Sequence, residues 1–541
     1  MVCCLGLAAQ TGDSLWQAVR IHPWLTSHNA APLVTYDGRN VTCVELSLTG
    51  AKGGLTDFSG SPTSHNADAS IESFFRLTPR TMVYGAMSYD NFSGDDMAGS
   101  AFLTSHLSPL TSHLSPQKHL PFDLVEDSLV NTGRKHSDTY RLAGAFGYDL
   151  YRGIALGARI DFAAANYAKY KDLRHKNKMM DMRLSAGIYM PLTSWLDIGA
   201  DYIYHRNIES VTFSTYGKTD RNYMTLISYA AFMGHVEQFG GAGYTDQSRE
   251  MPLVSDANGA GLQFSITPIR SRVSDGIPVG STSAPLRMYN SIYYMHSKGY
   301  YGRKSPYTIT YTNHKSDIYH YDGQISVATQ QSQFYLGFSL NAEKMQNAAN
   351  TYRGVQNETG ATYYEYYTPV KNSDKLWVDG SLILTADLST LYTLQAGFNW
   401  HHRHHTAYLY PYYRRQRFTA REFFLSVGRS FVVSKGLLSF TLDGAFQKGS
   451  GEPYEDLTFA APSDKQTAPA SMDAYLWREY QWLCAPQYTV GGNMKYAFLF
   501  PTTSLNTYVR IALHHRKANN TYEYSQGRDR TTATLAVGCN F

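Results

Sequence analysis

The chain has 541 residues, 17% of them charged, and a formal net charge of +4. A charge this close to balance argues against a dedicated nucleic-acid-binding protein. The sequence has no run of about eighteen apolar residues, which excludes a membrane-spanning helix, so a membrane protein of this sequence would have to be a closed β-barrel. The 43 Tyr, 25 Phe and 7 Trp residues suit the aromatic girdles of such a barrel, although they also suit a large soluble β-protein.

The amino-terminal part of the chain divides into two predicted segments. Residues 1–9 form a short apolar run that ends in small residues, as a secretory signal peptide does, and we expect them to be the remnant of such a signal, cleaved after Ala9. Residues 10–40 contain Trp16 and Trp24, and we expect a periplasmic segment before the barrel or a hatch inside it. The barrel itself is then expected over residues 41–541.

The first predicted strands are followed by a long polar connection. Val41–Ala51, Ile71–Leu77 and Thr81–Asn91 have the composition of strands and are bounded by turn residues. Residues Phe92–Asp138 form a predicted loop, in which the heptapeptide LTSHLSP occurs twice in succession. Its prolines would interrupt a strand, so we interpret the repeat as a low-complexity insertion.

From Thr139 onwards, apolar and polar side chains alternate. Leu142 and Phe146 fall on one face of the next predicted strand, whereas Arg141 and Asp149 fall on the other. The same pattern continues through the hairpin that follows and through the pair of strands between residues 182 and 205. Because successive side chains of a strand point to opposite faces, the pattern predicts a wall with lipid on one side and water on the other.

The carboxy-terminal half gives the direction of the strands. Counting back from the last predicted strand, Thr531–Phe541, to Ile318–Ala328, the short turns all fall at one end and the long polar connections at the other. Further candidates between residues 210 and 316 are Tyr223–His235, Ala260–Pro268, Arg287–His296 and Tyr307–Asn313, of which one or two could be loop instead of strand. The sequence therefore predicts an all-β fold, a transmembrane antiparallel up-and-down β-barrel of about 18 strands (16 to 20), with short periplasmic turns and long extracellular loops.

Charged residues recur on the face opposite the apolar one. They would be costly against lipid, so we expect them to line a hydrated lumen. These lumen-lining candidates are Arg141, Asp149, Arg159, Asp161, Arg183, Asp197, Asp201, Asp379, Asp387, Asp443, Lys495 and Arg510. They could form a hydrated ladder of ion pairs with little energetic consequence, or a constriction that selects solutes by charge.

Basic residues also gather where strands are predicted to meet the outer loops. Arg403 lies within a run of four histidines at residues 401–405, where a metal site is conceivable, but the sequence fixes no Cys or carboxylate beside it. We therefore expect contact with the phosphates of lipopolysaccharide. The candidates for this contact are Lys169, Lys171, Arg174, Lys176, Lys178 and Arg403.

Several runs of the sequence carry a resemblance to a known family. Tyr89–Asp96 (YDNFSGDD), Pro121–Asp127 (PFDLVED), Ala163–Lys176 (AAANYAKYKDLRHK) and Gly243–Glu250 (GYTDQSRE) resemble an uncharacterised family of outer-membrane β-barrel proteins of Bacteroides-type bacteria, which has no assigned biochemical function. The resemblance implies a Gram-negative cell and the bacterial outer membrane, and it brings no catalytic residues. The terminal Phe541 also resembles the signal by which the barrel-assembly machinery recognises such proteins.

The sequence favours a transport protein over an enzyme. Because no nucleotide-binding loop, zinc-hydrolase motif or nucleophile elbow occurs in a suitable setting, we predict no catalytic residue, no metal, no cofactor and no nucleic-acid partner. We expect a porin-like channel or a transporter for small solutes, with outer-membrane lipid, lipopolysaccharide and the assembly machinery as partners. The alternatives are a barrel for hydrophobic compounds that resembles fatty-acid transporters, a surface scaffold, an outer-membrane enzyme and a soluble β-protein.

Overall fold

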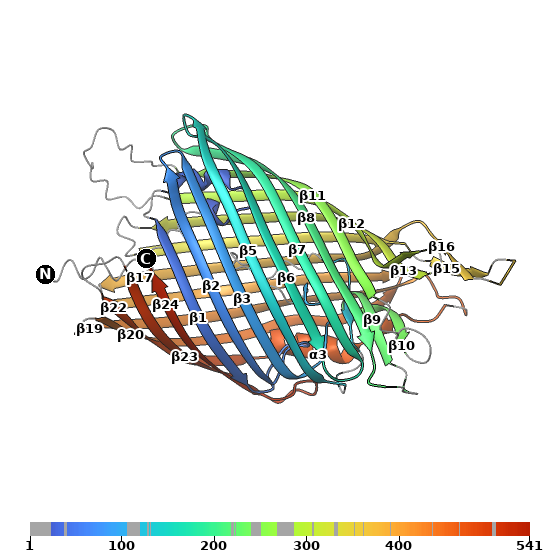
Figure 1. The fold of residues 1–541 in the computed structure, drawn as a ribbon. Helices are drawn as coiled ribbons and strands as arrows, with labels where there is room; N and C mark the ends of the chain where they lie inside the picture. The colour runs from blue at the N-terminus through green and yellow to red at the C-terminus, as the bar shows by residue number, and fades with distance from the viewer. Residues whose placement is uncertain are drawn as a thin grey trace.

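The computed structural model describes residues 23–541 apart from residues 37–39, 105–119, 127–128, 130, 218–220, 222, 240–249, 268–285, 306–307, 329–333, 351, 357, 361, 390, 435, 465 and 500–504. The predicted signal remnant and most of the LTSHLSP repeat lie outside these residues. Within them the chain forms a closed barrel that contains two further groups of elements (Figure 1). No helix of the described part is long and apolar enough to cross a membrane.

Eighteen antiparallel strands make the barrel. They are β1 (Val41–Lys52), β2 (Thr63–Thr78), β3 (Thr81–Met97), β5 (Gly133–Tyr151), β6 (Ile154–Lys169), β7 (Arg174–Pro191), β8 (Leu196–Ser214), β11 (Glu250–Ile266), β12 (Leu286–Ser305), β13 (Thr308–Ala328), β14 (Phe334–Ala349), β17 (Val370–Ser389), β18 (Tyr392–Leu409), β19 (Tyr412–Val433), β20 (Gly436–Thr458), β22 (Gln487–Leu499), β23 (Asn506–Ala518) and β24 (Asp529–Asn540). The last strand pairs with the first, with Val44 opposite Cys539, so the sheet closes on itself. The predicted antiparallel barrel of about 18 strands is confirmed.

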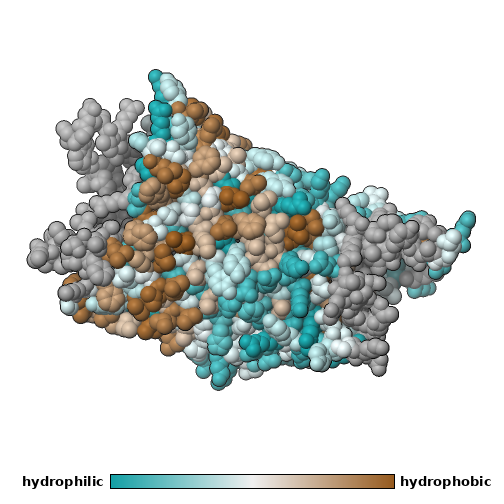
Figure 2. Space-filling model, viewed as in Figure 1, coloured by the Kyte–Doolittle hydropathy of each residue, from teal (hydrophilic) through white to brown (hydrophobic). Residues whose placement is uncertain are grey.

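The apolar residues of the alternating pattern form the outer surface of the barrel. Leu156 and Leu184 are 42% and 38% exposed, and Leu442 is 73% exposed. Exposed apolar side chains on this scale need a nonpolar surrounding, as the outer face of a membrane barrel has. In Figure 2 the apolar residues gather over the end of the barrel nearer the short turns, and hydrophilic residues cover much of the rest.

The two ends of the barrel differ in their connections. Short turns such as Thr78–Thr81, Tyr151–Ile154 and Val433–Gly436 lie at the same end as the carboxy-terminus, and we call this the short-turn end. The connections between β3 and β5, between β8 and β11 and between β20 and β22 lie at the opposite end, which we call the loop end. The predicted strand directions from Ile318 to the carboxy-terminus are thus correct.

The strands extend further toward the loop end than the sequence predicted. The predicted loop Phe92–Asp138 is shorter, because β3 continues to Met97 and β5 begins at Gly133. Apart from Tyr307, which lies outside the described residues, the candidates Tyr307–Asn313 and Ile318–Ala328 belong to one strand, β13. The prediction that Tyr223–His235 is a barrel strand is wrong, because this segment forms a hairpin inside the barrel. Its buried residues occupy consecutive positions instead of alternate ones.

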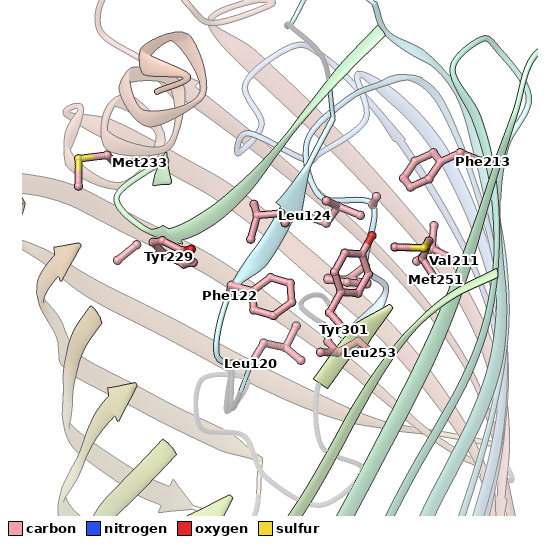
Figure 3. Close-up of a cluster of buried hydrophobic side chains, with 14 of the residues drawn as sticks. Leu120, Phe122, Leu124, Val211, Phe213, Tyr229, Met233, Met251, Leu253 and Tyr301 are labelled. Atoms are coloured by element: carbon pink, nitrogen blue, oxygen red, sulfur yellow. The ribbon is translucent and has the colours of Figure 1, made fainter. Parts of the chain in front are cut away.

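An inner sheet with a helix occupies the lumen at the loop end. Its four strands are β4 (Asp123–Val125), β9 (Tyr223–Ala230), β10 (Met233–Phe239) and β21 (Ala470–Ser471), and the helix α3 (Asp473–Cys484) follows the last of them. Figure 3 shows Phe122 and Leu124 packed toward the inward-facing Val211, Leu253 and Tyr301 of the barrel wall. Outside the barrel, β15 (Tyr352–Gln356) and β16 (Thr362–Tyr366) form a separate hairpin.

The segment before β1 fills the lumen nearer the short-turn end. It contains two short 3-10 helices, η1 (Pro23–Thr26) and η2 (Ala31–Thr35). Trp24 packs edge-on against Tyr189 and Tyr289, with ring centroids 5.4 and 5.0 Å away. Asn29 is 1% exposed and donates a hydrogen bond to the carbonyl of Ile188 at 2.9 Å. The described part of the predicted segment 10–40 therefore lies inside the barrel.

Candidate solute-binding cavity

A cavity of about 910 Å³ lies in the lumen between these two inner groups. Pro23, Thr26 and His28 line it from the amino-terminal segment, and Thr104 and Leu120 line it from the connection between β3 and β5. Leu483 of α3 and Ser27 also line it, and the remaining lining comes from the barrel strands. Its volume falls in the range of known small-molecule sites, roughly 300–1,000 Å³.

The β5–β8 side of the cavity carries a dense set of charged groups. Arg159 of β6 donates two hydrogen bonds of 2.8 Å to the carboxylate of Asp161. Asp181 of β7 lies 2.8 Å from Nε2 of His205 and accepts a hydrogen bond of 2.9 Å from Asn207. These strands are neighbours, with Asp161 opposite Arg183 and Asp181 opposite Asn207 in the register. The charges therefore form one continuous patch.

Two arginines of this patch have guanidinium groups that no described side chain engages directly. Within the part of the chain that the structure describes, Arg141 interacts electrostatically with Asp90 and Asp68, and Arg183 with Asp181, but neither forms a hydrogen bond or a close ion pair, and Nε of Arg183 is buried without a hydrogen-bond partner. A buried donor without a partner is costly, by about 1–3 kcal/mol, and marks a place where a ligand can supply the missing acceptor. Both side chains line the cavity.

The opposite side of the cavity, from β13 to β19, is acidic. Asp322 lies 2.8 Å from Nε2 of His320, and Asp379 forms an ion pair with His401. Glu422 accepts a hydrogen bond of 3.2 Å from Asn399. Arg421 also borders the cavity, but its side chain is exposed on the outward face of β19. Three carboxylates therefore face inward from this side, two with histidine partners and Glu422 with an asparagine partner.

The inner sheet is fixed to the barrel wall by a buried charged cluster. Glu126 forms ion pairs with Lys135 and Lys169, and His175 lies 3.2 Å from the same carboxylate. Burial would raise the pKa of Glu126, but the two ammonium groups and His175 outweigh it and hold the pKa well below its usual value. Glu126 is therefore ionised, and it anchors the connection between β3 and β5 to the wall.

A second anchor holds the same connection. The carboxylate of Glu209 accepts hydrogen bonds from the backbone N–H groups of Leu103 and Thr104 at 2.6 and 2.9 Å. Lys375, across the barrel on β17, donates to the carbonyl of Leu120 at 3.1 Å. The connection thus reaches from one side of the lumen to the other.

The twelve lumen-lining candidates all occupy inward positions or the short-turn rim. The structure brings five of them together around the cavity: Arg141, Arg159, Asp161, Arg183 and Asp379. Asp197 and Asp201 are buried nearer the short-turn end, beside Ser265 and Gln263. The others lie elsewhere on the wall: Asp443 with Ser426, Lys495 over Tyr508, Arg510 with Glu45, Asp149 beside the turn at Gly153, and Asp387 opposite Thr393.

Two of the six candidates for lipopolysaccharide contact need correction. Lys169 and Arg403 are 3% and 8% exposed and pair inside the barrel with Glu126 and Glu479. Both occupy inward positions of their strands, which places them away from lipid. The other four remain at the rim of the loop end. Lys171, Lys176 and Lys178 are exposed, and Arg174 bonds to Asp172 at 2.9 Å.

The histidine run is divided between the two faces of β18. His401 points inward to Asp379, whereas His402 bonds to Thr419 on the outward face. Among the described residues, no group of three or more His, Cys, Asp or Glu side chains is placed to hold a metal ion. Outward basic residues that the sequence reasoning missed lie beside the run: Arg417 is opposite His404, and Arg421 is opposite Lys448.

The inner anchors were also missed from the sequence. Glu126, Lys135 and Glu209 lie in segments that were interpreted as loop or were left unassigned, and their partners are distant in sequence. One signal was available, because the inward positions of β8 change from polar to apolar at Val211 and Phe213. A lumen face that becomes apolar must pack against protein, so this change indicates an inner element.

Among solved structures, the chain is similar to several outer-membrane proteins. The chain is similar to BauA, the ferric preacinetobactin receptor from Acinetobacter baumannii, with 8% identity and a TM-score of 0.36 over 92% of this chain and 80% of that chain. It is also similar to the outer membrane transporter YddB from Escherichia coli, with 9% identity and a TM-score of 0.38 over 92% of this chain and 80% of that chain. The ferripyoverdine receptor of the Pseudomonas aeruginosa outer membrane is similar with 10% identity and a TM-score of 0.40 over 93% of this chain and 72% of that chain.

The sequence comparisons give a family without a known activity. The model of a family described as a family of unknown function (DUF6850) matches residues 30–541. No curated protein matches the chain.

Proposed function

Because the chain belongs to this family of unknown function (DUF6850), its role has to be inferred from its own geometry, and we propose that it is an outer-membrane transporter that binds a small polar solute in the lumen cavity. The match agrees with the predicted uncharacterised family, while an origin in Bacteroides-type bacteria remains a prediction. The observation that carries the proposal is a cavity of about 910 Å³ with charged side chains on both sides and protein at either end.

The inner elements favour a transporter with a bound solute over a permanently open porin. The amino-terminal segment and the inner sheet both occupy the lumen, so a solute would cross only when each moves aside in turn. In the proposed orientation the short-turn end faces the periplasm and the loop end faces the cell exterior. The exposed apolar belt supports the outer membrane as the location.

A hydrophobic solute is less well supported. Arg141, Arg183 and Asp379 line the cavity, and burying such groups against an apolar molecule would cost free energy without replacing their hydration. Apolar residues such as Leu120, Ile318 and Leu483 also line the cavity, but the alternative that resembles fatty-acid transporters would leave these charged groups without hydration. A polar solute could supply hydrogen bonds to the same groups.

Transport can be tested with purified full-length protein in liposomes. We expect small polar solutes to enter protein-containing liposomes at a rate that saturates with concentration, because the solute binds before it crosses. Single-channel currents in planar bilayers should stay small, since the lumen is occupied. Absence of both uptake and binding for all polar solutes tried would rule the function out, and large permanent currents would favour the porin alternative.

We also propose that the basic rim at the loop end binds the phosphates of lipopolysaccharide. Lys171, Lys176 and Lys178 are exposed there, and Lys178 has a long, exposed ion pair of 3.7 Å with Glu250. The outward-facing Arg417 and Lys448 extend the basic rim on the other side of the barrel. Lysines beside the apolar belt lie at the depth where anionic headgroups are found.

Replacing Lys171, Lys176 and Lys178 together with Glu should weaken lipopolysaccharide binding about a hundredfold, because each basic residue near an anionic surface contributes about 1 kcal/mol. The lipopolysaccharide that co-purifies with the protein can be measured by mass spectrometry, alongside the sensitivity of cells to large antibiotics. Arg80→Glu with Arg152→Glu is the control, because both residues are exposed at the short-turn end. Equal lipid content in the triple variant and the control would contradict the proposal.

A further inference from the structure

The charges around the cavity are separated by side. All three inward arginines of the lining, Arg141, Arg159 and Arg183, are on β5–β7. Carboxylates occur there too, but Asp161 is neutralised by Arg159, and Asp181 lies against His205. Arg141 and Arg183 form no close ion pair with the described residues; Asp90 and Asp68 act on Arg141, and Asp181 acts on Arg183, only through longer-range electrostatic interactions. This side is therefore the anion-binding side.

The facing side has the opposite character. Asp322, Asp379 and Glu422 line the cavity from β13, β17 and β19. Among the described residues of these strands, Arg421 is the basic residue that borders the cavity, and its side chain points outward. Glu422 also interacts electrostatically with Arg516 of β23, which is not among the lining residues. The other two carboxylates are partnered by histidines. A cationic group in the cavity would be attracted to this side.

The two sides face each other across the lumen. In the strand order, β18 follows β6 by eight positions among eighteen, so these strands lie almost diametrically opposite. With strands about 4.8 Å apart and tilted by about 40°, the backbone-to-backbone diameter is roughly 35 Å. Long side chains on both sides reduce the open width to roughly 20 Å. A single amino acid would reach only one side, whereas an extended peptide of about six residues, at roughly 3.4 Å each, would reach both.

We propose that the solute is a short peptide with free termini, bound with its carboxylate at Arg141 and Arg183 and its ammonium group at the acidic side. The inference rests on the proposed transport function and names its substrate class. Carboxylates suit arginine because the guanidinium can donate two parallel hydrogen bonds. Arg183 lines the cavity, and its Nε has no hydrogen-bond partner among the described residues.

Hexaalanine provides a test, because its side chains carry no charge and each terminus can be capped separately. Binding to the purified full-length protein is measured by calorimetry, and uptake is measured in liposomes. We expect free hexaalanine to bind at least about tenfold more tightly than the N-acetylated or the C-amidated peptide, and to enter faster. Arg141→Gln with Arg183→Gln should remove the preference for a free carboxy-terminus only.

The complementary variant is Asp379→Asn with Glu422→Gln, which should remove only the preference for a free amino-terminus. Lys495→Gln is the control, because Lys495 lies on the inner wall outside the cavity, over Tyr508. Equal binding of free and capped peptides, with uptake of any polar solute intact, would overturn the peptide assignment and leave transport standing. Failure of every solute to bind or enter would remove the transport function, and the peptide assignment with it.

Discussion

Replacing Gly157 or Gly187 with Val is expected to displace the amino-terminal segment from the lumen. A Cβ atom at Gly157 would lie 2.3 Å from the backbone nitrogen of Ala31, and one at Gly187 would lie 2.3 Å from Oδ1 of Asn29. The two glycines are opposite each other on β6 and β7. Neither has a left-handed backbone, so the strands themselves accept a β-branched residue. The clash therefore falls on the segment.

Hydrogen exchange measures this displacement directly. Overpacking costs about 1–3 kcal/mol, so exchange in residues 23–36 should rise about ten- to a hundredfold. Exchange in β4 should not change, because the inner sheet has its own anchors at Glu126 and Glu209. Gly85→Val is the matched control, since a Cβ atom there meets no neighbour within 4 Å. Unchanged exchange in both variants would contradict the close fit of segment and wall.

Replacing Glu126 with Gln should release the connection between β3 and β5 at the loop end. Lys135 and Lys169 are almost completely buried, and they would keep two positive charges without a carboxylate between them. Removing one partner of a buried ion pair costs about 3–5 kcal/mol. Exchange in residues 98–104 and 120–126 should rise at least about a hundredfold, while residues 23–36 stay protected.

A half-exposed ion pair supplies the control for this variant. Glu45 pairs with Arg510 at 2.8 Å, with both side chains about one-third exposed, so Glu45→Gln should have an effect below about 1 kcal/mol. The prediction fails if Glu126→Gln and Glu45→Gln change exchange at the loop end equally. It also fails if Glu126→Gln loosens the amino-terminal segment to the same extent.

The same carboxylate gives the anchor a pH dependence. The pKa of Glu126 in the folded protein is below that of an unfolded glutamate, about 4.3. Between these two values the unfolded state binds more protons, so the stabilisation from Glu126 is complete above about pH 4.3 and falls as the pH drops further. Exchange at the loop end, corrected for intrinsic rates, should therefore rise on acidification in the wild type. Glu126→Gln should lack this part of the dependence.

The barrel could be predicted from the sequence because its physical rule is local. In β5, Leu142 and Phe146 lie on the outer face of the barrel, whereas Arg141 and Ala143 face the lumen. The two-residue period of a strand is enough to assign them to these two faces. Strand ends were harder to place. Beyond the apolar belt both faces are polar, so the alternation disappears although the ladder of hydrogen bonds continues, as in β3 up to Met97.

The contents of the lumen could not be predicted in the same way. Glu126 meets Lys135 and Lys169 only after the connection between β3 and β5 has folded inward, and no local period records such a contact. The cavity was partly accessible, since Arg141, Arg183 and Asp379 were assigned to the lumen. Their separation onto two sides depends on the order of strands around the barrel, and the uncertain region between residues 210 and 316 left that order open.

The strands of the inner sheet come from distant parts of the chain, and this affects when the sheet can form during biogenesis. Its strands come from residues 123–125, 223–239 and 470–471, so two of its three pairings, β4 with β9 and β10 with β21, join parts of the chain that are distant in sequence. Contacts of such long sequence separation form late, because the entropy of closing the intervening chain must be offset first. The seam of the barrel, where Val44 pairs with Cys539, closes a longer stretch of chain than any pairing of the inner sheet, so we expect it to form no earlier than that sheet.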